Sequence, residues 1–186
     1  QKRLDLPSWA QPGPFLETTS SLRSDLLDEY DNPRPEIATK LVRHLVVNGF
    51  GAEAKQMLTL YGDVIEDSEV LHDFARLVDL EAPCVLPMVA DGLIARTAPC
   101  HPEATLWRKI AGLPDGEPAV SFTDDEEEKA DDGQFLEKFA RLPAITRRIL
   151  GARLMDNLIA KGEFDLAKQL DLILLRSPSD ASDAPA

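Results

Sequence analysis

Two cysteines and a nearby pair of histidines are the residues best suited to metal or redox chemistry. Cys84, Cys100 and His101 supply soft ligands, and His72 would complete a set of four. Structural zinc sites, however, usually carry paired ligands a few residues apart, and this chain has no Cys-x-x-Cys. The spacing therefore argues against a zinc site.

The same two cysteines allow a disulfide. Cys84 and Cys100 lie in proline-marked segments on either side of one predicted helix. A helix from Pro87 to about Arg96 spans roughly 15 Å, whereas a disulfide needs Cα atoms within about 7 Å of each other. Two outcomes remain open. Either the flanking segments fold toward each other and a Cys84–Cys100 disulfide forms, or the cysteines are two separate buried thiols.

Motifs of the common catalytic and cofactor-binding sites are missing. The sequence has no P-loop, no Gly-x-Ser-x-Gly elbow and no dinucleotide-type glycine cluster after a strand. His44 and His72 fall within predicted helices, where we expect partly buried or surface side chains. The 33 acidic residues form too many pairs for one catalytic pair to be selected. We therefore expect no catalytic residue, no cofactor and no bound metal.

Arginines gather in one segment of this acidic chain. Arg147, Arg148 and Arg153 share one predicted helix. One interpretation is that the acidic run 124–132, just upstream, neutralises them. The other is that these three arginines form a contact site for an anion or an acidic peptide, which makes them candidate partner-binding residues.

The elements that must position these residues are helices. One apolar stripe has the period of an α-helix and is widened by three leucines; it contains Ile145, Ile149, Ala152, Met155 and Ile159, with Leu150, Leu154 and Leu158 beside them. Gly162 is a helix stop, because glycine tolerates the left-handed conformation. A second helix starts near Glu163, and its predicted apolar face consists of Phe164, Ala167, Leu170, Ile173 and Leu174. So short a connection forces the two helices antiparallel.

A weaker copy of this hairpin occurs around Gly49. When Gly49 is aligned with Gly162, the run Ala54-Lys55-Gln56-Met57 coincides with Ala167-Lys168-Gln169-Leu170. Upstream, Leu41, Leu45 and Val46 coincide with Leu154, Leu158 and Ile159. Both segments predict a helix, a glycine turn and a second helix, with a buried alanine where the helices approach each other.

This pattern resembles a known repeat family. The run Gly162-Glu163-Phe164-Asp165-Leu166-Ala167 is similar to the turn of a tetratricopeptide repeat, and the resemblance covers residues 36–62 and 144–176. Val42 and Met155 depart from the pattern, since the family has a small residue there. The resemblance implies antiparallel helical hairpins stacked in an α-solenoid that binds a protein or peptide.

We predict an all-α fold of about six or seven helices, stacked as antiparallel hairpins in a TPR-like α-solenoid. Residues 1–34 contain four prolines and predict an extended arm. The helical repeat domain covers 35–176, with an acidic loop inserted at 113–133. The tail 177–186 has the composition of a disordered linker.

Charge limits the choice of partner. Acidic residues outnumber basic ones 33 to 20, which gives a formal net charge of −13. So acidic a chain is poorly suited to nucleic-acid backbones or anionic membrane surfaces. No apolar run approaches the roughly 18 residues of a membrane span. We expect a protein or peptide partner, no nucleic acid and no membrane insertion.

The first residue is Gln rather than Met, so we expect this chain to belong to a longer gene product. Two cysteines in a chain that begins in a proline-rich stretch favour a periplasmic or secreted location over a cytoplasmic one.

Two functional hypotheses follow. The first is a non-enzymatic protein–protein interaction or scaffold module, which binds a partner through a groove between hairpins. The alternative is a helical domain of, or associated with, a polymer-acting hydrolase that uses clustered carboxylates. Convergence of carboxylates in one deep cleft would distinguish the second hypothesis from the first.

Overall fold

The computed structural model describes residues 4–79, 102–113 and 134–176, and in these residues the fold is all-α, as the sequence predicts. Apart from the helices, the described residues contain an isolated β-bridge between Leu27 and Pro33.

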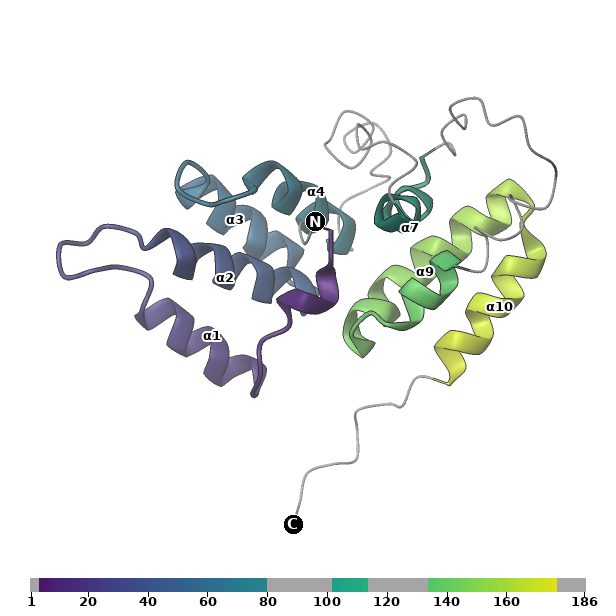
Figure 1. Ribbon diagram of the computed structural model, residues 1–186, viewed down its shortest axis with the longest axis horizontal. Coiled ribbons are helices and arrows are strands. Elements are labelled where there is room, and N and C mark those ends of the chain that lie inside the picture. The colour runs from purple at the N-terminus through teal and green to yellow at the C-terminus, as the bar shows by residue number, and fades with distance from the viewer. Residues whose placement is uncertain (1–3, 80–101, 114–133, 177–186) are drawn as a thin grey trace, which may run out of the picture. The chain divides into compact units, whose positions relative to one another are not determined.

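The chain divides into two compact units, residues 1–97 and residues 98–186. The helical domain predicted for 35–176 therefore spans parts of both units. Each unit has its own set of helices (Figure 1).

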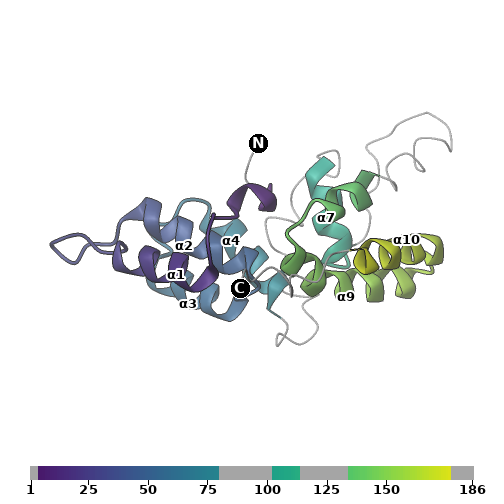
Figure 2. The same ribbon diagram turned by 90° about the horizontal axis from the view of Figure 1, so that it is seen from below.

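Helix α2 is the centre of the first unit. The elements of this unit are, in chain order, η1 (Leu6–Trp9), α1 (Phe15–Ser24), α2 (Pro35–Val47), α3 (Gly51–Tyr61) and α4 (Ser68–Val78). Helix α2 contacts all four of the others, and they gather around it in Figure 2. Pro35 begins α2 at a position where its missing N–H costs nothing. The buried core of the unit includes Leu41, Leu45, Leu71, Phe74 and Leu77.

Residues 1–34 do not form the extended arm that the sequence predicted, because they contain η1 and α1. Pro7 lies in the first turn of η1, and Pro14 is the N-cap of α1. The prolines therefore precede or begin the helices instead of interrupting them. No proline occurs between Pro14 and Pro33, so a helix of ten residues fits in that interval.

Helices α3 and α4 approach each other so closely that position 51 has room only for glycine. A Cβ atom on Gly51 would collide with the backbone oxygen of Ala75 and would lie 2.8 Å from the backbone nitrogen of Asp79. Beside this contact, Lys55 of α3 forms an ion pair with the buried Asp79. The glycine thus permits a close helix–helix contact, and the ion pair supports it.

The second unit is built on α9. Its elements are α7 (Pro102–Ile110), a helical segment at 134–140, α9 (Ala144–Lys161) and α10 (Phe164–Leu175). Both α7 and α10 contact α9. Gly151 allows α10 to approach α9 closely, since a Cβ atom there would lie 2.7 Å from Leu174 Cδ2. The fully buried side chains of this unit include Trp107, Ile110, Phe135, Phe139 and Leu150.

The two glycine turns have the same backbone structure. Gly49 has φ 82° and Gly162 has φ 79°, both in the left-handed region. In each turn the glycine N–H donates to a carbonyl three residues earlier at 3.0 Å, and the next N–H donates to a carbonyl five residues earlier at 2.9 Å. The acceptors are Val46 and Leu45 in the first turn and Ile159 and Leu158 in the second. These bonds define the Schellman motif that ends a helix at a glycine.

The alanines that follow these turns are buried, which confirms the prediction from the sequence. Ala54 is 0% exposed and Ala167 is 8% exposed. Helices α2 and α3 pack against each other, and so do α9 and α10. Each unit therefore contains one hairpin with the same turn and the same small residue after it.

Candidate protein-interaction site

Helix α10 has two faces that differ in exposure. Ala167 and Leu170 are buried, whereas Phe164, Leu172 and Leu175 are 59%, 51% and 74% exposed. Lys168 and Asp171 are also exposed and lie on the same side of the helix as these apolar residues. We call this surface the α10 face: Phe164, Lys168, Asp171, Leu172 and Leu175. Apolar side chains gathered on an exposed helix face are typical of interaction surfaces.

The sequence interpretation placed Phe164 on one apolar face with Leu170, but in the structure Leu170 is buried and Phe164 is exposed. Phe164 lies roughly 120° around the helix from Leu170, which is the centre of the buried stripe. Ile145 and Ile159, predicted on the apolar stripe of α9, are likewise 41% and 49% exposed. The signal for the α10 face was present in the sequence as the spacing of Phe164, Lys168, Asp171 and Leu175.

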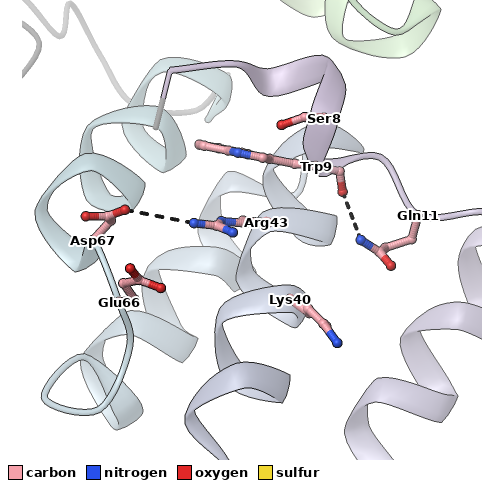
Figure 3. Close-up of a pocket in the computed structure, with 7 residues that line it drawn as sticks. All are labelled: Ser8, Trp9, Gln11, Lys40, Arg43, Glu66 and Asp67. Carbon is pink, nitrogen blue, oxygen red and sulfur yellow. Dashed lines mark hydrogen bonds and ion pairs between the residues drawn. The ribbon is translucent and has the colours of Figure 1, made fainter. Parts of the chain in front are cut away.

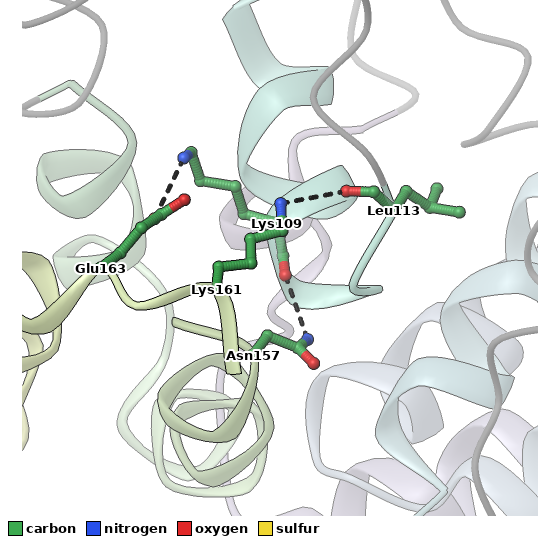
Figure 4. A network of polar contacts seen from close by, with 5 residues as sticks. All are labelled: Lys109, Leu113, Asn157, Lys161 and Glu163. Atoms are coloured by element: carbon green, nitrogen blue, oxygen red, sulfur yellow. Dashed lines mark hydrogen bonds and ion pairs between the residues drawn. The ribbon is translucent and has the colours of Figure 1, made fainter. Parts of the chain in front are cut away.

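Polar side chains connect α7 to α9 and to the start of α10 (Figure 4). Asn157 Nδ2 donates to the carbonyls of Lys109 and Ile110 at 3.2 and 2.9 Å, and Lys161 Nζ donates to the carbonyl of Leu113 at 3.3 Å. Lys109 and Ile110 are the last two residues of α7, and Leu113 follows the helix. The buried Lys109 also reaches Glu163, with 3.5 Å between Nζ and Oε2. Because Glu163 precedes Phe164, this network fixes the first residue of the α10 face.

A pocket of about 390 Å³ lies in the first unit, where η1 meets α2 and the start of α4. Side chains of both charges line it together with an indole ring (Figure 3): Ser8, Trp9, Gln11, Lys40, Arg43, Glu66 and Asp67. Asp67 has φ 59°, a left-handed conformation that is uncommon outside glycine.

Interactions between its own lining residues shape this pocket. The guanidinium carbon of Arg43 lies 5.4 Å from the centroid of the Trp9 ring, and Arg43 Nη2 lies 3.9 Å from Asp67 Oδ2. Trp9 also meets Phe74 edge to face, with 5.1 Å between the ring centroids. A cation over an indole face and an edge-to-face ring pair both stabilise the position of the indole. Through Arg43 and Phe74, Trp9 therefore anchors η1 onto α2 and α4.

Two of the three histidines lie in the described residues, and neither joins the pocket. Burial lowers the pKa of His44, although a hydrogen bond to the backbone of Phe15 opposes this. Burial, assisted by the charge of Arg76, lowers the pKa of His72. Both residues lie within helices, as the sequence predicted; His72 is half-buried, whereas His44 is more deeply buried than expected.

The three predicted partner-binding arginines lie in different environments in the structure. Arg147 is half-buried and donates to the backbone oxygen of Ala140. Arg148 is exposed, while Arg153 is half-buried and interacts within the structure. Arg147 thus connects α9 to the end of the segment 134–140, which is a structural role.

Several of the predicted features lie outside the described residues. These are the acidic run 124–132, His101 and both cysteines of the predicted pair, Cys84 and Cys100. Within the described residues, no three His, Cys, Asp or Glu side chains are grouped so that they could hold a metal ion. No helix in that part of the chain is long and apolar enough to cross a membrane.

Comparison of the sequence with protein-family models, and of the chain with curated proteins and solved structures, found no match.

Proposed function

We propose that this chain is a non-enzymatic protein–protein interaction module that binds a partner through the α10 face. The observation that carries the proposal is the exposure of Phe164, Leu172 and Leu175, which are all more than half accessible to solvent. In water, such a stripe gains free energy when another apolar surface covers it.

The proposed architecture is that of a degenerate TPR-like scaffold. Its support is the pair of matching hairpins, in which Gly49 and Gly162 form the same turn and Ala54 and Ala167 are buried after it. Hairpins of this kind stack and leave a helix face available for a partner.

The expected partner segment is an amphipathic helix. The α10 face is a single helical stripe, and a stripe fits the apolar side of another helix better than it fits an extended peptide. Full burial of one large apolar side chain contributes about 1.5–3 kcal/mol. The three apolar side chains therefore supply enough to offset part of the entropic cost of association.

A site-specific crosslinking experiment tests this function. The photoreactive residue p-benzoylphenylalanine replaces Leu172, so that Phe164 and Leu175 remain to make the contact. When the cells that express this variant are irradiated, we expect a covalent adduct between the chain and its protein partner. The matched control places the same residue at Leu60, which is 70% exposed on α3 in the first unit, and should yield no such adduct.

A second variant tests whether the crosslink from position 172 depends on the α10 face. Leu175→Glu introduces a charge into the apolar stripe and should abolish crosslinking from position 172, while the helical circular dichroism spectrum stays unchanged. Equal crosslinking from positions 172 and 60, or an adduct that is insensitive to Leu175→Glu, would exclude the α10 face as the binding surface.

A further inference from the structure

The α10 face has the spacing of a coiled-coil seam. Phe164, Lys168, Asp171 and Leu175 follow one another at intervals of four, three and four residues, which is the alternation of d and a positions in a heptad. All four side chains are exposed. The seam therefore points away from the buried side of α10, and Leu172 widens it.

The seam is complementary to a reversed copy of itself. Along the chain its residues are apolar, positive, negative and apolar. In an antiparallel helix pair, an a position of one helix faces a d position of the other. Phe164 then faces Leu175 of the second copy, and Lys168 faces Asp171 of the second copy. A parallel pair would place Lys168 beside Lys168 and Asp171 beside Asp171, and like charges at such positions are destabilising.

From this pattern we propose that α10 pairs antiparallel with α10 of a second copy of this chain. The proposal rests on the proposed function, because it uses the same face and names the partner. A two-fold dimer uses one self-complementary patch on both copies and is the commonest symmetry among homo-oligomers. If the partner were a different protein, the charges of this seam would have no reason to complement the same seam read in the opposite direction.

The central charges are available for this pairing. Lys168 lies 3.3 Å from Asp165 within α10, but the two side chains are 77% and 94% exposed. An ion pair so exposed contributes little, so Lys168 can exchange it for Asp171 of the second copy. Only two apolar residues per copy lie on the seam itself, and we therefore expect reversible dimerisation in the micromolar to millimolar range.

Sedimentation equilibrium of the full chain tests the pairing. The wild-type chain should show a reversible monomer–dimer equilibrium at micromolar to millimolar concentration. Lys168→Glu alone, or Asp171→Lys alone, gives like charges in both central layers and should raise the dimer dissociation constant about tenfold or more. Lys40→Glu makes the same charge change on an exposed lysine of the first unit and should leave the constant unchanged.

The decisive sample is an equimolar mixture of the Lys168→Glu and Asp171→Lys chains. In a mixed antiparallel pair, the introduced glutamate faces the introduced lysine, and the original Asp171 faces the original Lys168. We therefore expect the mixture to dimerise more tightly than either variant alone. This result cannot come from contacts within one helix, since each chain of the mixture keeps its own like charges.

Two results would overturn the self-pairing of α10. Neither result by itself would exclude the proposed interaction function. A wild-type chain that stays monomeric up to millimolar concentration has no self-pairing, and a mixture that dimerises no more tightly than either variant alone rules out the antiparallel register. If the wild-type chain is monomeric and position 172 still crosslinks to a different protein, the interaction function stands and self-pairing fails. Absence of both adduct and dimer removes both proposals.

Discussion

At the scale of single residues, His44 shows how burial decides a protonation state. Its Nε2 lies 3.4 Å from the backbone oxygen of Phe15, and its Nδ1 lies 3.5 Å from Asn48 Nδ2. A neutral ring with its proton on Nε2 matches both contacts, because a carbonyl accepts a hydrogen bond and an amide nitrogen donates one. Phe15 also stacks on the His44 ring, with 5.1 Å between the centroids. A neutral His44 thus helps to join α1 to α2.

We predict that the chain loses stability as the pH falls below 6.5. Burial lowers the pKa of folded His44 from 6.5, so the unfolded chain takes up this proton first. The contribution of neutral His44 is present above pH 6.5 and is lost as the pH falls through the lower folded pKa, by at most about 1.4 kcal/mol per pH unit. Urea unfolding about one pH unit above and below 6.5 measures the loss.

The His44→Gln variant separates this residue from all other titrating groups, including His72. Glutamine stays neutral, so the variant should lose less stability than the wild type over the same pH interval. An equal loss in both proteins would contradict the assignment to His44.

At the scale of the elements, two glycines permit the packing for different reasons. The backbone conformation at position 162 favours glycine, because φ is 79°. Space is not the reason, since a Cβ atom there would meet nothing within 4 Å. Gly51 is required by its surroundings, because a Cβ atom would collide with the backbone of α4. The first glycine ends a helix, and the second brings two helices together.

We predict that alanine at these two positions has different costs. Gly162→Ala should lower the free energy of unfolding by about 1 kcal/mol, the price of the left-handed conformation. Gly162→Asn should cost less, since Asn tolerates that conformation. Gly51→Ala should cost more than Gly162→Ala, because α3 and α4 must move apart, and overpacking typically costs about 1–3 kcal/mol.

Urea midpoints of the three glycine variants decide between these causes. If Gly162→Asn were as destabilising as Gly162→Ala, the cost would not come from the backbone conformation. If Gly51→Ala were milder than Gly162→Ala, the close approach of α3 and α4 would not limit position 51.

At the scale of the whole molecule, the chain has two cores. The first unit buries Leu41, Leu45 and Phe74, and the second buries Trp107, Phe139 and Leu150. Each unit also contains one glycine-turn hairpin, α2–α3 in the first and α9–α10 in the second. Each therefore has the apolar interior and the local connections of a folding unit.

We predict that residues 1–97 and residues 98–186 fold when they are produced separately. Each fragment keeps the buried side chains of its own unit, so each should show a helical circular dichroism spectrum and a cooperative urea transition. A fragment that is helical only in the presence of the other would show that its core depends on contacts between the units.

Local patterns in the sequence determined much of the secondary structure of this protein. The apolar period and the glycine stops predicted the hairpins on either side of Gly49 and Gly162, and the structure has α2–α3 and α9–α10 there. The burial of Ala54 and Ala167 was predicted as well. These features depend on the intrinsic preferences of nearby residues, which the sequence displays directly.

Tertiary structure decided which helix faces are covered and where the N-terminal segment lies. Periodicity places Phe164 and Leu170 on α10, but only the packing of α10 against α9 buries Leu170 and leaves Phe164 exposed. Likewise, proline content predicted an extended arm, yet the segment forms η1 and α1, with Trp9 packed against Phe74 and Arg43 and Phe15 stacked on His44. Such contacts join residues distant in sequence, and their free energy outweighs local preference.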